Sequence, residues 1–367
     1  MDPCSTDSPN EILCEFELLR GAGVGPRRAG ATGEGAAAVL RSAQSGAGGE
    51  PARLAGVGQI EVYLPRSYDG SRTTRFPVLY LLHGREGSRA DWTQPGYQGM
   101  TIQGLMDSLT AARAVQEMIV VLPTATNPYA GSYYSNSPVI GNGEDYISRE
   151  LVAWVDSAFR TVRAPAGRGI AGHSMGGFGA VIMAMRHSDV FGVAYAMEPC
   201  CLAMVEDISA KNEAWGRMAQ FNDVAALRAA ERKGDFYPIA IVGLSAVMSP
   251  NPGKPPLYVD LPYQRCGDSV CAVEPVLARW RPQFPVAQVG QARDALLRLR
   301  VPIRLEYAFD DQFPHIPPGV QMLADSLSAH RVPYRLDAFD GDHRNRMRER
   351  MTTIVLPFFS AALARTP

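Results

Sequence analysis

The stretch GRGIAGHSMGGFGAVIMAM at residues 167–185 decides the fold. Its centre, from Gly172 to Gly176, reads G-x-S-x-G, the pattern of a serine held on a sharp turn between a strand and a helix. The bare pattern is weak evidence because short motifs of common residues recur by chance. The surrounding sequence therefore decides whether Ser174 is a nucleophile or an ordinary serine between glycines.

A strand, a tight turn and a helix surround Ser174 in the order that the pattern requires. RGIAGH at 168–173 predicts a strand entering the turn, and MGGFGAVIMAMRH at 175–187 predicts a helix leaving it. Gly172 and Gly176 have a steric reason, because the turn strains the serine backbone and packs helix against strand too closely for Cβ atoms. These features predict a nucleophilic serine at this turn.

The chain from Gln59 onward alternates strands with helices. FPVLYLLHG at 76–84 and MIVVLPT at 118–124 are continuous apolar runs, typical of strands that are covered on both faces of a parallel sheet. IRLEYAF at 303–309 and PYRLDAF at 333–339 alternate apolar and polar residues, which is typical of strands near a solvated edge. Further strands are expected at 59–65 and 193–198, and helices at 101–114 and 143–162. The pattern predicts an α/β fold with a central, mostly parallel sheet flanked by helices.

We expect the α/β domain to cover residues 56–367. Two segments, one before this domain and one inside it, differ from the rest of the chain in sequence pattern. Residues 1–55 are rich in Gly, Ala, Arg and Ser without a sustained period, which predicts a mobile extension. Its GAGVG lacks a preceding strand and a following G-K-[ST], so a nucleotide site is not expected. Residues of about 200–300 form a long insertion after the nucleophile half, and such insertions are usually lids or binding loops. We expect it to cover the pocket, with PPLYVDLPY at 255–263 as apolar wall.

Composition limits the partners. The 367 residues carry a formal charge of -1 from 36 basic and 37 acidic side chains, and neither sign forms a long block. We therefore expect a small-molecule partner rather than a nucleic acid or an acidic membrane surface. No run of eighteen apolar residues is present, and the amino terminus lacks the basic start and apolar middle of a signal peptide. No membrane span or export signal is expected in the chain as given, and the compartment and oligomeric state stay open.

Six cysteines stand at positions 4, 14, 200, 201, 266 and 271. They are too few for a disulfide framework at this length and lack the paired C-x-x-C spacing of a zinc site, so no metal is expected. Cys266 and Cys271 either close a small loop in an oxidising compartment or remain free buried thiols.

A catalytic serine needs a base to take its proton and an acid to fix the tautomer of that base. In this fold type the chain order is serine, acid, histidine. Of the six histidines, four lie beside turns or near helix ends: His83, His173, His187 and His330. His343 follows the last alternating strand on a Gly-containing loop, at the carboxyl end of the sheet where ligands meet open α/β folds. His343 is therefore the predicted base.

The acid and the oxyanion donors follow from position. Asp310 and Asp311 come directly after the strand at 303–309, and adjacent residues at a strand end point in different directions, so only one reaches Nδ1 of His343. An oxyanion hole needs two backbone N–H groups. One is expected from Met175, which follows the nucleophile, and the other from Arg85, in the loop after LLHG.

Together these segments resemble the esterase-D-like family of α/β-hydrolases, which includes feruloyl and acetyl-xylan esterases, S-formylglutathione hydrolases and mycobacterial mycolyltransferase antigens. The resemblance runs from about Gln59 to the end of the chain and is strongest up to Pro199. Its sequence segments are FPVLYLLHG, DW at 91–92, AGSYYSNSPVIGNGEDYISRELVAWVDSAFRT at 130–161, GIAGHSMGGFGAVIMAMRHSDVFG at 169–192 and DGDH at 340–343. Residues 1–55 do not resemble the family's amino-terminal strands.

The resemblance implies an α/β-hydrolase fold and a mechanism through an acyl-enzyme without a cofactor. It implies Ser174 as nucleophile, His343 as base, and Arg85 and Met175 as oxyanion donors. In the family pattern the acid stands three residues after a small residue that ends the strand. Counting from Ala308, that residue is Asp311.

We therefore expect a serine carboxylic-ester hydrolase that acts on a small or aryl ester. A second enzyme hypothesis keeps the same acyl-enzyme but passes the acyl group to an alcohol or sugar, as the mycolyltransferases do. A third hypothesis is a non-catalytic binding module on a hydrolase scaffold, because a fold does not fix a function.

Overall fold

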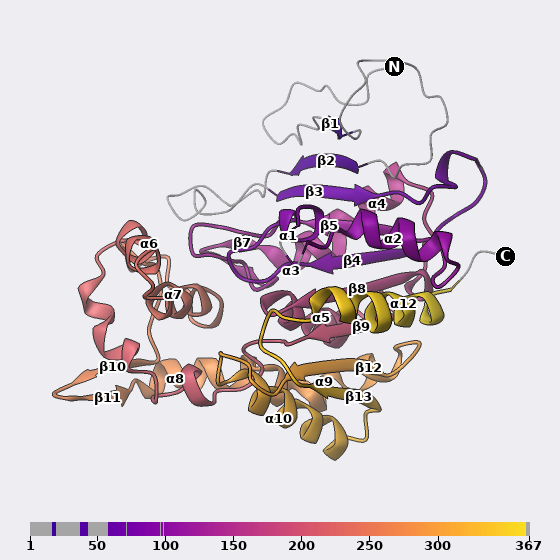
Figure 1. Ribbon diagram of the computed structural model, residues 1–367. Helices are drawn as coiled ribbons and strands as arrows, with labels where there is room; N and C mark the ends of the chain where they lie inside the picture. The colour runs from indigo at the N-terminus through magenta and orange to yellow at the C-terminus, as the bar shows by residue number, and fades with distance from the viewer. Residues whose placement is uncertain are drawn as a thin grey trace.

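A nine-stranded sheet forms the centre of the protein, as described by a computed structural model for residues 17–19, 37–42, 58–70, 72–95, 97 and 99–364. The strand order is β1-β2-β3-β5-β4-β8-β9-β12-β13 (Figure 1). The strands are β1 (Glu17–Leu19), β2 (Ala37–Ser42), β3 (Gly58–Tyr63), β4 (Val78–Leu82), β5 (Ile119–Pro123), β8 (Arg168–His173), β9 (Val193–Met197), β12 (Ile303–Ala308) and β13 (Tyr334–Phe339).

The six strands from β5 to β13 in this order run parallel, and β3 joins them antiparallel through β5. The sheet is therefore mostly parallel, as predicted. Strand β4 explains why the prediction succeeds: all five of its residues are buried, with Val78, Tyr80 and Leu82 in one core and Leu79 and Leu81 in the other. The edge strand β13 is only partly buried, which matches its alternating sequence.

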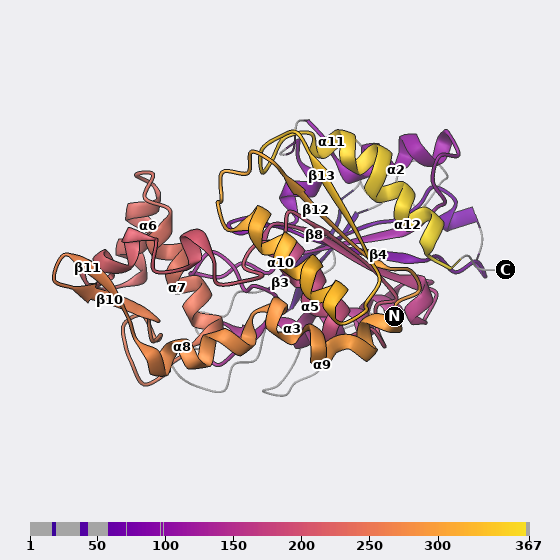
Figure 2. The same ribbon diagram turned by 90° about the horizontal axis from the view of Figure 1, so that it is seen from below.

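Helices cover both faces of the sheet, as Figure 2 shows edge-on. One layer holds α2 (Ile102–Ala111), α11 (Met347–Arg350) and α12 (Leu356–Ala362), and the other holds α3 (Gly143–Asp145), α5 (Met175–Arg186), α9 (Pro285–Leu297) and α10 (Ile316–Ala329). The sheet domain also contains α1 (Ala90–Thr93), α4 (Val152–Ala158) and two π-helices, Tyr146–Leu151 before α4 and Met351–Val355 between α11 and α12. The helix predicted at 143–162 is one helical segment with a π-helical middle, and it ends four residues earlier, at Ala158.

The insertion between β9 and β12 gathers beside the sheet, at the end toward which the arrow of β4 points (Figure 1). It contains α6 (Val224–Glu231), α7 (Tyr237–Met248), α8 (Glu274–Trp280) and the hairpin of β10 (Tyr263–Cys266) and β11 (Ser269–Ala272). Parallel strands present their carboxyl ends at this side, where ligands bind open α/β sheets.

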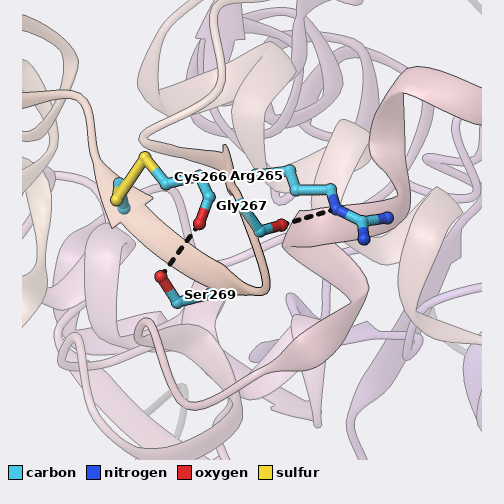
Figure 3. Close-up of a disulfide and its surroundings, with 5 residues drawn as sticks. Arg265, Cys266, Gly267 and Ser269 are labelled. Carbon is cyan, nitrogen blue, oxygen red and sulfur yellow. Dashed lines mark hydrogen bonds between the residues drawn. A yellow bond between two sulfur atoms is a disulfide. The ribbon is translucent and has the colours of Figure 1, made fainter.

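The tip of the β10–β11 hairpin carries a disulfide between Cys266 and Cys271, whose Cα atoms are 5.7 Å apart (Figure 3). Ser269 Oγ donates to the carbonyl of Cys266 at 3.0 Å, and Arg265 Nε donates to the carbonyl of Gly267 at 2.9 Å. Of the two alternatives for Cys266 and Cys271, the structure has the closed loop.

Residues 1–55 were predicted as a mobile extension, and two short parts of them are instead strands. Strand β2 pairs antiparallel with β3, and β1 pairs with β2 at the edge of the sheet. Each is at most six residues long and is surrounded by Gly-rich sequence, which leaves too little length for a periodic pattern to show. The rest of the predicted extension lies outside the described residues. No helix in the described part of the chain is long and apolar enough to cross a membrane.

Candidate active site

Ser174 lies on the sharp turn between β8 and α5, with φ 58° and ψ -116°. Positive φ is rare for residues other than glycine and marks a strained, functionally constrained position. A Cβ on Gly172 would collide with the backbone of Gly176, and a Cβ on Gly176 would collide with the carbonyl of Leu82. The two glycines are therefore required by the close packing of α5 on the sheet.

The two predicted oxyanion donors flank this turn. Met175 is the first residue of α5, where backbone N–H groups have no acceptor inside the helix. Arg85 follows β4 and, like Ser174, lines the cavity. Within the described residues, neither backbone N–H is bonded to another group of the protein. Both donors are therefore available to a ligand oxygen.

His343 and Asp311 form a buried pair on the loops that follow β13 and β12. Nδ1 of His343 lies 2.8 Å from Oδ2 of Asp311, and both side chains are at most 5% exposed. The other carboxylate oxygen of Asp311 accepts from the backbone N–H of Phe313 at 2.9 Å, which fixes its orientation. Asp310 is exposed, and its backbone N–H donates to Gly341. The structure thus brings Asp311, and not Asp310, to His343.

Ser174 and His343 line one cavity of about 420 Å³. Among the described residues, Ser174 Oγ makes no hydrogen bond, so its contact with Nε2 of His343 is not formed in this structure. Contacts between catalytic groups often tighten only in the complex with substrate. Of the five predicted site residues, Ser174, His343 and Arg85 line this cavity, while Met175 follows Ser174 in the chain and Asp311 contacts His343.

Burial controls the charge of His343. Desolvation lowers the pKa of the imidazole below its ordinary value of 6.5, and hydrogen bonding to Asp311 only partly offsets this. The ring of Phe313 packs on it edge-to-face with centroids 4.8 Å apart. A neutral imidazole is the form that can accept a proton from a serine.

A buried polar network behind His343 was missed by the sequence analysis. Nε2 of His173 contacts the carbonyl of His343 at 2.7 Å and Glu198 at 3.0 Å, and burial lowers the pKa of His173 to about 3. Glu198 in turn pairs with Arg350, which also pairs with Glu306. Burial raises the pKa of Glu198 to about 7. The sequence signal for this network was Glu198, a glutamate directly after the apolar run of β9.

The other predicted histidine assignments are consistent with structural roles. Nε2 of His83 accepts from the backbone N–H of Ala125 at 2.8 Å. His187 ends α5 and contacts Glu144 at 2.9 Å, and His330 ends α10. His315, for which the sequence suggested no role, lines the cavity.

The insertion supplies one wall of the cavity, but not through the predicted segment 255–263. The apolar wall consists instead of Ile208, Trp215, Phe236, Tyr237, Ile241 and Leu244. Tyr258, Val259 and Tyr263 of the predicted segment pack into the core of the insertion, where Tyr263 meets Trp215 at 5.2 Å between ring centroids. The aromatic content of residues 255–263 correctly indicated burial. It does not distinguish a residue that lines a pocket from one that packs in a core.

Comparison with known proteins identifies the family. Residues 53–303, more than half of the chain, match the family described as "Putative esterase". The chain belongs to this esterase family. Esterase Rv1288 of Mycobacterium tuberculosis is 36% identical over 139 residues, which are 37% of this chain and 27% of that protein. An endo-1,4-beta-xylanase/feruloyl esterase of Xylanibacter ruminicola is 30% identical over 139 residues, 36% of this chain and 18% of that protein. The match spans well under a third of either relative's length.

Solved structures share the fold of this esterase. A ferulic acid esterase superimposes with a TM-score of 0.62 at 21% identity, over 90% of this chain and 99% of that chain. An S-formylglutathione hydrolase from Agrobacterium tumefaciens has a TM-score of 0.53 at 16% identity, over 91% and 97% of the two chains. The predicted α/β-hydrolase fold and the family resemblance are confirmed.

Proposed function

We propose that this protein hydrolyses carboxylic esters through an acyl-enzyme on Ser174. The observation that carries the proposal is the buried Asp311–His343 pair, 2.8 Å apart, on the cavity into which the strained Ser174 turn opens. Acid, histidine and serine on the carboxyl side of one sheet form the constellation that activates a hydroxyl for attack.

In the proposed reaction, Ser174 Oγ attacks the ester carbonyl carbon as Nε2 of His343 takes the hydroxyl proton. Asp311 holds Nδ1–H and stabilises the imidazolium that forms. The N–H groups of Arg85 and Met175 bind the oxyanion of the tetrahedral intermediate. The bond between the carbonyl carbon and the alcohol oxygen then breaks as His343 passes its proton to that oxygen, and the alcohol leaves. Water then attacks the acyl-enzyme with His343 again as base, which releases the carboxylic acid and restores Ser174.

The substrate we propose is a small or aryl ester. A cavity of about 420 Å³ accommodates a ligand of modest size, and Trp215, Phe236 and Phe313 give it flat apolar surfaces. One relative with 30% identity over a 139-residue segment is named as a feruloyl esterase, and a feruloyl group is a planar aromatic acid. An aromatic acyl group therefore fits the aromatic lining of the cavity and agrees with the similarity to a feruloyl esterase.

A substrate panel tests this proposal. Acyl p-nitrophenyl esters of increasing length and methyl hydroxycinnamates are assayed with and without an acceptor alcohol, while a fluorophosphonate probe reports on Ser174. We expect probe labelling at Ser174, faster turnover of aryl esters, and free acid as the main product in both conditions. Transfer of the acyl group to the alcohol would assign a transferase, and a folded protein that neither reacts with the probe nor hydrolyses an ester would contradict the proposal.

A further inference from the structure

A second cluster of reactive side chains lies on the cavity wall near Ser174. Cys200 and Cys201 follow β9, and His315 directly precedes α10. The two sulfur atoms and an imidazole nitrogen all lie within 4.8 Å of one another, and the three residues are each at least 92% buried while lining the cavity. The proposed ester hydrolysis uses none of them.

His315 is oriented as a ligand. Its Nδ1 lies 3.0 Å from both carboxylate oxygens of Asp207, which also accepts from the hydroxyl of Tyr237 at 3.0 Å. With its Nδ1–H donated to Asp207, His315 offers Nε2 to a metal, which binds there in place of a proton. That atom is buried and has no hydrogen-bond partner among the described residues. A carboxylate on one nitrogen of a histidine whose other nitrogen is unpartnered is the usual outer arrangement of a metal-binding imidazole.

The backbone brings adjacent thiols to the same side. Successive side chains in extended chain point in opposite directions, which would separate Cys200 from Cys201. Cys201 has φ 59°, a left-handed conformation that side chains adopt rarely and that clusters at functional sites. The bend lets both sulfur atoms face His315.

We propose that Cys200, Cys201 and His315 bind a zinc ion whose fourth position faces the substrate cavity. Two thiolates and an imidazole are ligands that Zn²⁺ prefers, and a site with three protein ligands keeps one position open. In a tetrahedral site with Zn–S bonds of about 2.3 Å the sulfur atoms stand about 3.8 Å apart, within the spacing of this cluster. With both thiols and Nε2 of His315 deprotonated, the two thiolate charges balance the charge of the ion, so the centre has no net charge. Arg85, a cation on the same cavity, is paired with Glu231.

The other cluster with metal-ligand residue types does not fit a metal. His173, Glu198 and His343 also lie close together, but most of their donor atoms are already engaged. Nδ1 of His173 meets the hydroxyl of Tyr97 at 3.0 Å, and Glu198 pairs with the cation of Arg350 at 3.1 Å. In the Cys200–Cys201–His315 cluster, by contrast, the donor atoms converge on one another without a competing cation such as Arg350.

Zinc at this site would obstruct the substrate. The backbone N–H of Cys200 donates to the carbonyl of Ser174 at 3.2 Å, so the cluster begins beside the proposed nucleophile. An ion with a water in its open position occupies part of the same 420 Å³ space. Bound zinc therefore narrows the cavity and slows ester hydrolysis.

The binding test uses the full chain with Cys4→Ser and Cys14→Ser, because its remaining thiols are then Cys200 and Cys201 when the disulfide is formed. Zn²⁺ is titrated against a chromophoric chelator, and Co²⁺ serves as a spectroscopic probe because cobalt–thiolate bonds absorb intensely by charge transfer. We expect one zinc per chain, a cobalt–thiolate band, and protection of both cysteines from alkylation by Zn²⁺. A folded protein with neither the band nor the protection would overturn the site.

Variants locate the ion. Cys200→Ser and His315→Ala should lose the bound zinc, and Asp207→Asn should weaken its affinity about 10- to 100-fold through loss of the orienting carboxylate. His330→Ala is the matched control because His330 ends the same helix that His315 precedes, and it should bind zinc like its parent. Unchanged affinity in folded Cys200→Ser and His315→Ala would contradict the proposal.

The rate test rests on the proposed ester hydrolysis, whereas the binding tests do not. Each protein's rate with Zn²⁺ is divided by its own metal-free rate. We expect inhibition of the parent and relief in Cys200→Ser and His315→Ala. If zinc bound without changing a measurable rate, the inference that zinc obstructs the cavity would be wrong. If zinc bound to a protein that hydrolyses no ester, only the proposed function would be wrong.

Discussion

Two aspartate–histidine pairs face the same cavity. Asp311 contacts Nδ1 of His343 at 2.8 Å, and Asp207 contacts Nδ1 of His315 at 3.0 Å. In both pairs the carboxylate contacts Nδ1, so the nitrogen left for another partner is Nε2. What differs is the group that lies nearby on the cavity and that we propose as the partner: the hydroxyl of Ser174 for His343, and two thiols for His315. The same pair can therefore prepare a general base or a metal ligand, and the neighbouring group decides which.

The two histidines also differ in charge. Burial dominates at His343 and lowers its pKa, whereas at His315 the same effect of burial is outweighed by Asp207, which contacts Nδ1 with both oxygens and raises the pKa to about 9. Asp311 presents one oxygen to His343 and the other to a backbone N–H, whereas both oxygens of Asp207 contact His315 and Cys200 further raises the pKa of His315. We therefore expect the first pair to carry the reaction and the second to take no part in it.

The largest expected effect is that of Ser174→Ala. Removing the nucleophile should lower ester turnover by several orders of magnitude, to the ~10³ to 10⁴ over water that binding and an oxyanion hole retain. Steady-state kinetics on a freshly purified variant measures this, with circular dichroism as the folding control. Near wild-type turnover would remove Ser174 from the mechanism.

The next largest effect is expected among three variants in which an aspartate is replaced by asparagine. Asp311→Asn should lower turnover by roughly 10⁴, because it disfavours the tautomer that accepts the serine proton. Asp310→Asn should keep most of the activity, since that carboxylate is exposed and does not reach His343. Asp207→Asn should cost much less than Asp311→Asn in metal-free buffer.

Kinetics on these three purified variants separate the pairs. A loss in Asp207→Asn as large as that in Asp311→Asn would mean that the second pair also takes part in hydrolysis. A loss confined to Asp310→Asn would move the acid by one residue. Zinc affinity gives the reciprocal readout, because Asp207→Asn should weaken it and Asp311→Asn should not.

The two pairs were not equally predictable from sequence. The sheet and the turn at Ser174 were predictable, because continuous apolar strands and a G-x-S-x-G turn each have a local steric cause. Asp311 and His343 follow predicted strands, so the sheet brings them together. Asp207 lies in a short helical turn of the insertion, and it meets His315 only through an arrangement of elements that no local pattern describes. For the same reason the pocket wall was assigned to the wrong part of the insertion.

The pH dependence should show the low pKa of His343. The base works in its neutral form, so kcat/KM is lost as the pH falls through the pKa of His343 in the free enzyme. Since burial lowers that pKa, the acid limb should lie below the ordinary histidine value of about 6.5. Phe313→Ala exposes the ring and should move the limb upward, while Asp310→Asn should leave it in place. A limb above the ordinary histidine value would contradict a desolvated base.

The smallest expected effect is that of Arg85→Ala. The proposed oxyanion donor is the backbone N–H, which alanine keeps, so kcat should fall far less than in Ser174→Ala. The side chain instead connects the loop after β4 to the insertion. Its guanidinium pairs with Glu231 of α6 and lies 4.2 Å from the ring centre of Phe236. Loss of this tie should loosen the aromatic wall and raise KM for aryl esters more than for acetyl esters. Glu231→Gln tests the same tie from the other side and should give the same selective rise. If Arg85→Ala instead abolished kcat for every ester while Glu231→Gln did not, the guanidinium itself would act on the reacting carbonyl.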